Sequence, residues 1–432
     1  MKIRVIAALI AGLNLCRVAD AAPAADELAE IRTQLQGLTQ RVERLEQDNA
    51  ALRAQNEALR ASSSSKAAAA APAVAPATDV AAATPSTQRP SAEWTDRITA
   101  RGDLRYRWER TTDAALNRSS HDDARYRDRI RARLGFDARV TDNLSATVLV
   151  ATGGDDPRSA NQTLGGANSR KAIGFDLAYF DWKYASWGSL LGGKMKYPFA
   201  RPGQSLFYDS DVNPEGVALG FNRGIWFGSS YSFWVEERAT AADTMVYGGQ
   251  VGARLPLGDA SLMLAVQYSD LSHGQGFQPY YNRLSNGNST DDGTPSGRLL
   301  YDFNVIELAA EFDTRIASLP LQLWANVAQN QDPSDLNLAW GAGFMLGKAS
   351  AAHSWEVGAG YQSIEKDALF GQFLESDFAD GRTDAHGWVL RTGYAPVRNL
   401  TLNALYYNTQ RQMDVGTPVN GERVQLDFNL KF

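Results

Sequence analysis

Residues 423–432 read Arg-Val-Gln-Leu-Asp-Phe-Asn-Leu-Lys-Phe, and this stretch decides the fold. Its even-numbered positions are apolar and its odd-numbered positions are polar. Successive side chains of a β-strand point to opposite faces of the sheet, so this strand has one apolar face and one polar face. Such a strand suits a wall with lipid on one side and water on the other, as in a transmembrane β-barrel.

The same alternation recurs from about residue 94 to the end of the chain. Five arginines share one face of the segment 125–140, and mostly apolar residues occupy its other face. Shorter alternating segments follow at 144–150, 262–269, 306–313 and 338–346. The alternative fold is a soluble β-propeller or sandwich. It would not set five arginines opposite a lipid-like face, and the sequence has no blade-length repeat.

The connections between these segments alternate between long and short. Short ones, rich in Gly, Pro, Asn and Asp, lie at 141–143, 184–188, 222–224, 256–259, 315–320, 348–351 and 395–399. Long polar ones lie near 110–124, 153–172, 199–214, 237–242, 270–300, 330–335, 365–384 and 411–420. This order predicts an all-β, antiparallel, up-and-down transmembrane barrel of about 16 strands, with long loops outside the cell and short turns in the periplasm.

The composition limits the possible functions. The chain has 432 residues and a net charge of −6, with 43 basic and 49 acidic side chains, which is too balanced for nucleic acid to be the main ligand. Its single cysteine, Cys16, excludes an intramolecular disulfide framework and a cysteine-rich zinc site. The four histidines are scattered without metal-ligand spacing. We therefore expect no metal site, no cofactor and no catalytic residue.

The N-terminal quarter has a different character. Residues 1–21 are typical of a secretory signal peptide, ending in Ala19-Asp20-Ala21. Residues 26–60 follow a heptad pattern that predicts an α-helical, parallel coiled coil, with one amphipathic helix packed on a globular domain as the alternative. The a positions are Leu28, Leu35, Val42, Asn49 and Asn56, and the d positions are Ile31, Leu38, Leu45, Leu52 and Leu59. Residues 61–93, rich in Ala, Ser, Pro and Thr, predict a spacer before the barrel at 94–432.

Several stretches of the barrel segment together resemble the sequences of a known family. They are Arg101-Gly-Asp-Leu-Arg-Tyr-Arg107, 129–135, 151–157, 177–182, 193–196 and 213–216, together with the terminal Phe432. Between residues 95 and 220 they closely resemble a family of Gram-negative putative porins. The resemblance implies a large barrel in the cell outer membrane, in contact with lipid and lipopolysaccharide, that carries an N-terminal coil. It supplies no catalytic residue and does not identify the solute.

A 16-stranded barrel is wide enough for a water-filled channel, so its lining should determine its function. The pore-lining residues that we predict are Arg101, Arg105, Arg107, Arg125, Arg127, Arg129, Arg131 and Arg133. Large porins that this chain resembles fold their third long loop into the pore, which here predicts a constriction loop with Asp209, Asp211 and Glu215. Two readings stay open. Either the arginine wall favours anions, or Asp103, Glu109, Asp137 and the loop acids neutralise it and leave a weakly selective pore.

The sequence thus predicts an outer-membrane porin, a passive diffusion channel for small hydrophilic solutes and ions. A structural tether is the first alternative, in which a periplasmic coil contacts peptidoglycan. A barrel lipid hydrolase is the second, although Ser and His cannot be paired from the sequence. We expect a homo-oligomer. Resemblance to large porins favours a trimer, whereas Asn at the a positions of the coil favours a dimer.

Overall fold

The computed structural model describes residues 94–113 and 124–432, and the signal peptide, coiled coil and spacer predicted for residues 1–93 lie outside them. The described residues form two short 3-10 helices and seventeen β-strands. They are η2 (Trp94–Arg97), β1 (Ile98–Asp113), β2 (Arg125–Arg139), β3 (Leu144–Thr152), β4 (Gln162–Thr163), β5 (Ile173–Ala185), β6 (Gly188–Lys194), β7 (Glu215–Arg223), β8 (Trp226–Glu236), β9 (Thr244–Leu257), β10 (Ala260–Ser272), β11 (Phe303–Ile316), β12 (Leu319–Asn330), β13 (Leu338–Gly347), β14 (Ser354–Ile364), η3 (Gly371–Phe373), β15 (Ala385–Val397), β16 (Leu400–Arg411) and β17 (Val419–Lys431).

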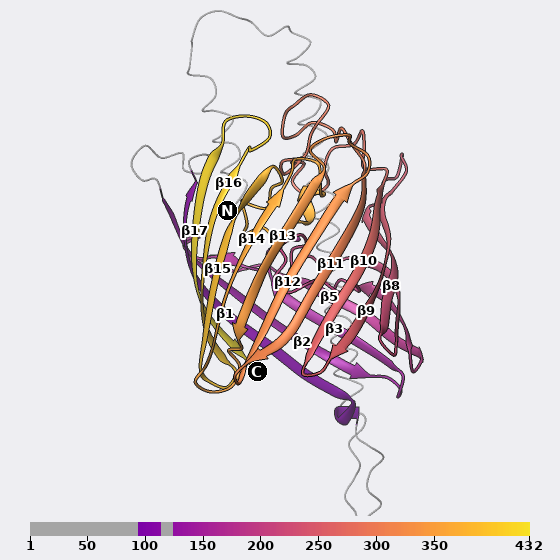
Figure 1. Ribbon diagram of the computed structural model, residues 1–432, viewed down its shortest axis with the longest axis vertical. Helices are drawn as coiled ribbons and strands as arrows, with labels where there is room; N and C mark the ends of the chain where they lie inside the picture. The colour runs from indigo at the N-terminus through magenta and orange to yellow at the C-terminus, as the bar shows by residue number, and fades with distance from the viewer. Residues whose placement is uncertain (1–93, 114–123) are drawn as a thin grey trace, which may run out of the picture. The chain divides into compact units, whose positions relative to one another are not determined.

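The strands form one antiparallel sheet that closes on itself (Figure 1). Each long strand pairs with the next one in the chain, and β1 pairs with both β2 and β17. At the seam, the backbone N–H of Gly102 donates to the carbonyl oxygen of Phe432 over 2.8 Å, and the N–H of Phe432 donates back to the carbonyl of Gly102 over 3.0 Å. With the two-residue β4 set aside, sixteen strands make up the wall, which confirms the predicted sixteen-stranded up-and-down barrel.

The two ends of the barrel differ. Short turns join the strands at 140–143, 186–187, 224–225, 258–259, 317–318, 348–353 and 398–399, and we call this the short-turn end. The long-loop end carries the connections 153–172, 195–214, 237–243, 273–302, 331–337, 365–384 and 412–418, and the loop predicted between β1 and β2 falls largely outside the described residues. Because β1 begins and β17 finishes at the short-turn end, η2 and the C-terminus lie there together (Figure 1).

Burial along the strands is the reverse of that in a soluble protein. On β17 the polar side chains of Arg423, Gln425 and Asp427 are 7%, 0% and 6% exposed, whereas Leu426 and Phe428 are 48% and 43% exposed. The polar face therefore lines the interior, and the apolar face forms the outer surface that lipid covers. Among the described residues, none of the helices has the length and apolar character needed to cross a membrane.

Two local features differ from the predicted pattern. Strand β6 ends at Lys194, so the third long loop begins at 195 rather than 199. Pro198 and Pro202 lie within this loop, and because proline cannot donate a ladder hydrogen bond, they disfavour a continued strand there. In addition, the loop 153–172 contains β4, which pairs with Arg129 and Ile130 of β2.

Three long loops fold into the barrel and bury an apolar cluster there. The loops 195–214, 273–302 and 365–384 contribute side chains such as Phe207, Leu299 and Phe378, which are 2% exposed or less. Inward-facing residues of the wall, among them Phe233 on β8, complete the cluster. Backbone groups also connect the loops, since the N–H of Asp209 donates to the carbonyl of Phe373 over 2.7 Å. The sequence placed only the first of these loops in the lumen.

Candidate channel constriction

The predicted arginines come together on three neighbouring strands. Odd-numbered residues of β1, β2 and β17 face the interior, and the strand register sets Arg107 opposite Arg129 on one side and Asp427 on the other. Arg105 lies opposite Arg131 in the same way. Like charges directly opposite each other destabilise a sheet unless other groups compensate them, so this wall requires carboxylates.

Strand carboxylates supply part of that compensation. Arg107 binds Asp427 through two hydrogen bonds of 2.7 and 2.9 Å, a bidentate geometry. Glu109, which is fully buried, accepts hydrogen bonds from Arg127 and lies 3.8 Å from Arg129. Asp103 pairs with Arg131 at 3.0 Å and with Arg133 at 2.8 Å. The acids are interleaved with the arginines on the wall itself.

Loop carboxylates complete the compensation. Asp377, in the loop 365–384, pairs with Arg107 at 2.9 Å and with Arg423 at 2.7 Å. Asp380 of the same loop pairs with Arg423 at 2.6 Å and with Arg411 at 3.3 Å. Asp211, in the loop 195–214, lies 3.7 Å from Arg131. Two loops are thus held against the arginine wall by ion pairs.

The charges on this wall nearly balance within the described residues. Eight arginines and seven carboxylates form ion pairs of 4.0 Å or less, in three clusters. Arg105, Arg107, Arg411 and Arg423 pair with Asp377, Asp380 and Asp427; Arg127 and Arg129 pair with Glu109; and Arg131 and Arg133 pair with Asp103, Asp176 and Asp211. Only three of these acids belong to the same three strands, so the balance depends on the neighbouring loops and on Asp176 of β5.

The other predicted site residues lie in different surroundings. Arg101 pairs with Asp137 at 2.8 Å near the short-turn end, where both side chains are 40% or more exposed. Arg125 is exposed at the start of β2, opposite Thr111. Asp209 is buried and accepts hydrogen bonds from the backbone N–H groups of Asp211 and Ser376, so it connects the loops rather than facing an arginine. Glu215 begins β7 and pairs with Lys194 at 3.0 Å.

Several residues of this wall were not singled out from the sequence. Arg423 and Asp427 are on the polar face of residues 423–432. Their position in that alternating pattern is the sequence feature that could have identified them as lumenal residues. Asp377 and Asp380 lie in the seventh long loop, within a short acidic run that begins at Glu375. Asp377 is 270 residues from Arg107 in the chain, so no local pattern could have joined them.

The loop acids differ in how readily they ionise. Burial, together with the nearby carboxylates of Asp377 and Asp211, raises the pKa of Glu375 to about 7. Burial opposes the ionisation of Asp377, but the guanidinium groups of Arg107 and Arg423 outweigh it and lower the pKa of that carboxyl. Burial and the neighbouring Glu375 raise the pKa of Asp209. Glu375 is therefore a loop carboxyl that titrates close to neutral pH.

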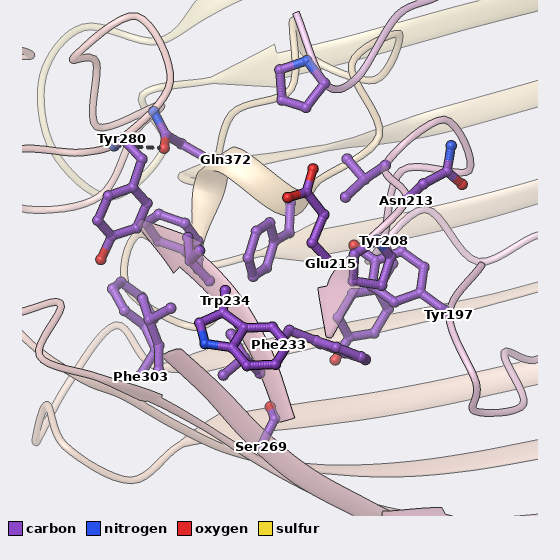
Figure 2. A pocket seen from close by; sticks show the side chains of 18 of the residues that line it. Tyr197, Tyr208, Asn213, Glu215, Phe233, Trp234, Ser269, Tyr280, Phe303 and Gln372 are labelled. Atoms are coloured by element: carbon purple, nitrogen blue, oxygen red, sulfur yellow. Dashed lines mark hydrogen bonds between the residues drawn. The ribbon is translucent and has the colours of Figure 1, made fainter. Parts of the chain in front are cut away.

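Open space lies along a different part of the lumen. One cavity of about 430 Å³ is lined by residues from the three inward loops and from the loop-side parts of β8 to β11. Figure 2 shows this cavity, with Tyr280 and Phe303 on one side and Tyr197 and Tyr208 on the other. A second cavity of about 520 Å³ lies nearer the short-turn end, beside Trp187, Asn222 and Arg254. The described residues contain no group of three or more His, Cys, Asp or Glu side chains that could hold a metal ion.

Known proteins match this chain through one family and one type of fold. The profile of the family described as Putative porin matches residues 111–296 and 298–432. No curated protein sequence matches significantly. Among solved structures, OprB of Pseudomonas putida is 13% identical, covers 79% of this chain and 96% of its own, and gives a TM-score of 0.53. The outer membrane channel DcaP of Acinetobacter baumannii is 13% identical, covers 78% and 97%, and gives 0.47. At 13% identity, the likeness to OprB concerns the fold.

Proposed function

Because this chain belongs to the Putative porin family, we propose that its barrel is a passive diffusion channel for small hydrophilic solutes and ions across the outer membrane. The observation that carries the proposal is the closed sixteen-stranded wall, whose interior side chains are charged and whose outer side chains are apolar. Barrels of this size leave room for an aqueous path. The test is the ion conductance of the purified protein in planar bilayers, and a folded protein that never conducts would contradict it.

The nearly balanced ion pairs of this wall support a weakly ion-selective pore. Seven carboxylates offset all but one of the charges of eight arginines, so little unscreened positive charge is left on this wall to attract anions. We expect reversal potentials near zero in a KCl gradient. The other reading, an anion-biased wall, requires a clear chloride preference that disappears when Arg105, Arg107 and Arg131 are replaced by glutamine. Those two measurements distinguish the readings.

We also propose that the chain assembles as a homo-oligomer, with a trimer as the form to test. A transmembrane β-strand needs about 9–11 residues. Strand β6 has 7 residues and its neighbour β7 has 9, so this side of the wall is the one least able to span lipid alone. Contact with another protomer would cover it, as Val217 and Leu219 on the outer face of β7 are 43% and 48% exposed.

Cysteine cross-linking tests this assembly. The chain has one native cysteine, at position 16 within the expected signal peptide. Once the signal peptide is removed, an introduced cysteine is the only thiol that can form a cross-link. We expect Leu219→Cys to cross-link protomers in membranes. Leu390→Cys, on β15 across the barrel and 47% exposed, is the matched control and should stay monomeric. Cross-linking of the β15 variant alone would contradict the proposed interface. Because one thiol per protomer joins at most two protomers, the mass of the native complex in detergent would separate trimer from dimer.

The orientation follows from the usual rule for such barrels. We propose that the long loops face outside the cell, among lipopolysaccharide, and that the short turns face the periplasm. The segment 26–60 would then be a periplasmic coil, able to tie protomers together or to contact peptidoglycan. Deleting 26–60 tests this. Loss of envelope attachment with unchanged solute uptake would assign a tether role to the coil, whereas loss of cross-linked oligomers would assign assembly to it.

A further inference from the structure

The cavity of about 430 Å³ has an unusual lining for a polar pore. Its walls include Tyr208, Tyr231, Phe233, Phe303, Phe370 and Phe373, which come from two loops and two strands. Phe233 lies near the loop-side end of β8, and Phe303 begins β11. The cavity therefore belongs to the long-loop half of the lumen. Its volume falls within the range of roughly 300–1,000 Å³ that is typical of small-molecule sites.

The aromatic residues form two packed groups that flank this space. In one group, Phe199 contacts Tyr231 with ring centroids 5.3 Å apart, and Tyr231 stacks on Phe233 at 4.7 Å. In the other, Phe370 contacts Phe303 at 5.4 Å and Phe373 at 5.0 Å. These separations are those at which aromatic rings attract one another. Both groups line the cavity, as Figure 2 shows for Phe233 and Phe303.

Two aromatic side chains lie between this cavity and the second one, of about 520 Å³, nearer the short-turn end. They are Tyr197 and Phe199, which line both cavities, and we call them the partition. Beyond them, the guanidinium of Arg254 lies 3.9 Å from the ring centre of Phe227, which also lines the second cavity. Aromatic surfaces thus mark the route from one space to the next, away from the arginine wall.

The two glutamine amides beside the cavity are engaged by the protein itself. The Gln372 carboxamide oxygen accepts from the backbone N–H groups of Tyr280 and Tyr281, and its nitrogen donates to the carbonyl of Leu284. The Gln267 amide donates to the hydroxyl of Tyr208 over 3.2 Å. Other polar atoms of the lining are buried without a hydrogen-bond partner within the described residues, among them the hydroxyls of Tyr197 and Tyr231. A solute in this cavity therefore meets aromatic ring faces with hydroxyl groups at their rims.

An ion pair lies at the edge of the cavity. Lys194 and Glu215 pair at 3.0 Å, and the Glu215 side chain is 63% exposed. Figure 2 shows Glu215 beside the aromatic groups. A solute with an apolar ring and a polar or charged end could place its ring between the aromatic groups while its polar end stays hydrated near this ion pair.

We propose that this cavity is a binding site for small aromatic solutes that carry a polar end, on a path that crosses the partition of Tyr197 and Phe199. The site rests on the proposed channel function, because it selects among solutes that diffuse through the same lumen. It makes the channel selective by chemistry as well as by size.

Single-channel recording with added solute tests the proposal. Phenylalanine is a suitable probe because, as a zwitterion, it does not dissolve in the bilayer. Cyclohexylalanine offers the same shape without a ring π-system, and glucose represents carbohydrates. We expect saturable, concentration-dependent blocking of the ion current by phenylalanine, with weaker block by cyclohexylalanine and none by glucose.

Variants locate the site. Phe233→Leu and Phe373→Leu each remove one ring while keeping an apolar side chain, and should weaken phenylalanine binding by about 3- to 10-fold. Phe175→Leu is the matched control, because Phe175 is 67% exposed on the outer face of β5, and it should bind as the original protein does. Each variant must first conduct ions, which shows that its barrel has folded.

The outcomes separate this site from the channel itself. A conducting protein that phenylalanine does not block would overturn the site and leave the channel intact. Block by glucose, or block by cyclohexylalanine as strong as that by phenylalanine, would also overturn the site. So would Phe233→Leu and Phe373→Leu variants that bind phenylalanine as tightly as the original protein does. A folded protein that conducts no ions would instead remove the proposed channel function.

Discussion

Arg107 on β1 and Asp377 in the loop 365–384 form an ion pair of 2.9 Å that holds a lumenal loop against the wall. Asp377 reaches Arg423 at 2.7 Å in the same way, and Arg107 also keeps its bidentate pair with Asp427. One loop carboxylate therefore offsets two wall arginines, and the loop position and the charge of the wall are linked.

Asp377→Asn should shift the channel toward anions. The substitution keeps the shape of the side chain but leaves Arg107 and Arg423 with one carboxylate fewer. We expect the chloride-to-potassium permeability ratio to rise by about two- to five-fold, or roughly 0.4–1 kcal/mol, as measured by reversal potentials. Asp259→Asn, in an exposed turn at the short-turn end, is the charge-matched control. An equal shift in both variants would contradict a local effect.

The pairing of the lumenal loops should weaken as the pH rises through neutrality. Glu375 has an ordinary pKa of 4.5, which burial and the carboxylates of Asp377 and Asp211 raise to about 7. Between these values the folded loop binds more protons than the released loop, so the free energy that holds it falls with increasing pH. We expect a steadier, smaller current at pH 5 than at pH 8, with a midpoint near 7.

Glu375→Gln removes the titrating group. The current of this variant should no longer depend on pH and should stay at the smaller value that the original protein shows at pH 5. Asp209 is part of the same cluster, and its raised pKa acts in the same direction. A Glu375→Gln channel with an unchanged midpoint would assign the transition to Asp209 instead. A current that falls with increasing pH would contradict the sign of the effect.

Gly203→Ala should displace the third loop from the wall. Gly203 has a φ of +43°, and a Cβ there would collide with the side chain of Trp324 on β12. We expect faster cleavage by trypsin after Lys196, in the same loop, and a larger conductance. Gly276→Ala is the matched control, because Gly276 also has a positive φ, of +77°, but has no atoms within 4 Å of the added Cβ. Similar behaviour of both variants would indicate backbone strain rather than a collision.

Glu109→Gln should destabilise the seam of the barrel. Glu109 is fully buried, accepts from Arg127 and from the Gln425 amide at 3.0 Å, and lies near Arg129. Without its charge, two arginines lose their strand partner. We expect the free energy of unfolding in urea to fall by roughly 1–3 kcal/mol. This decrease is smaller than that for breaking a fully buried ion pair, because the side chain of Arg127 is 19% exposed and water can solvate it. Glu237→Gln, in an exposed loop, should leave it unchanged.

The wall could be predicted from the sequence because its signal is local. Alternation of side chains in β17 and β2 indicated the two faces, and the order of long and short connections gave the sixteen strands. The arrangement of the lumen was harder to predict because its contacts join distant segments. Asp377 meets Arg107 across 270 residues, and Tyr231 meets Phe199 from a different element. The predicted coil at 26–60 stays a prediction.

The same distinction applies to Asp209 in the third loop. Asp209 was predicted in the constriction from its position in that loop, yet its carboxylate satisfies two backbone N–H groups. A carboxylate in a polar loop has the same sequence signature whether it faces a pore or caps a neighbouring loop. Only the seventh long loop, which enters the lumen beside it, distinguishes the two roles.

The hydrogen bonds between Gly102 and Phe432 have a consequence for biogenesis. They join strands from the two ends of the barrel segment, and the ring of Phe432 occupies the space that a side chain at position 102 would need. The wall therefore cannot close until β17 has reached β1. Until that contact forms, both strands present unpaired edges that are open to aggregation.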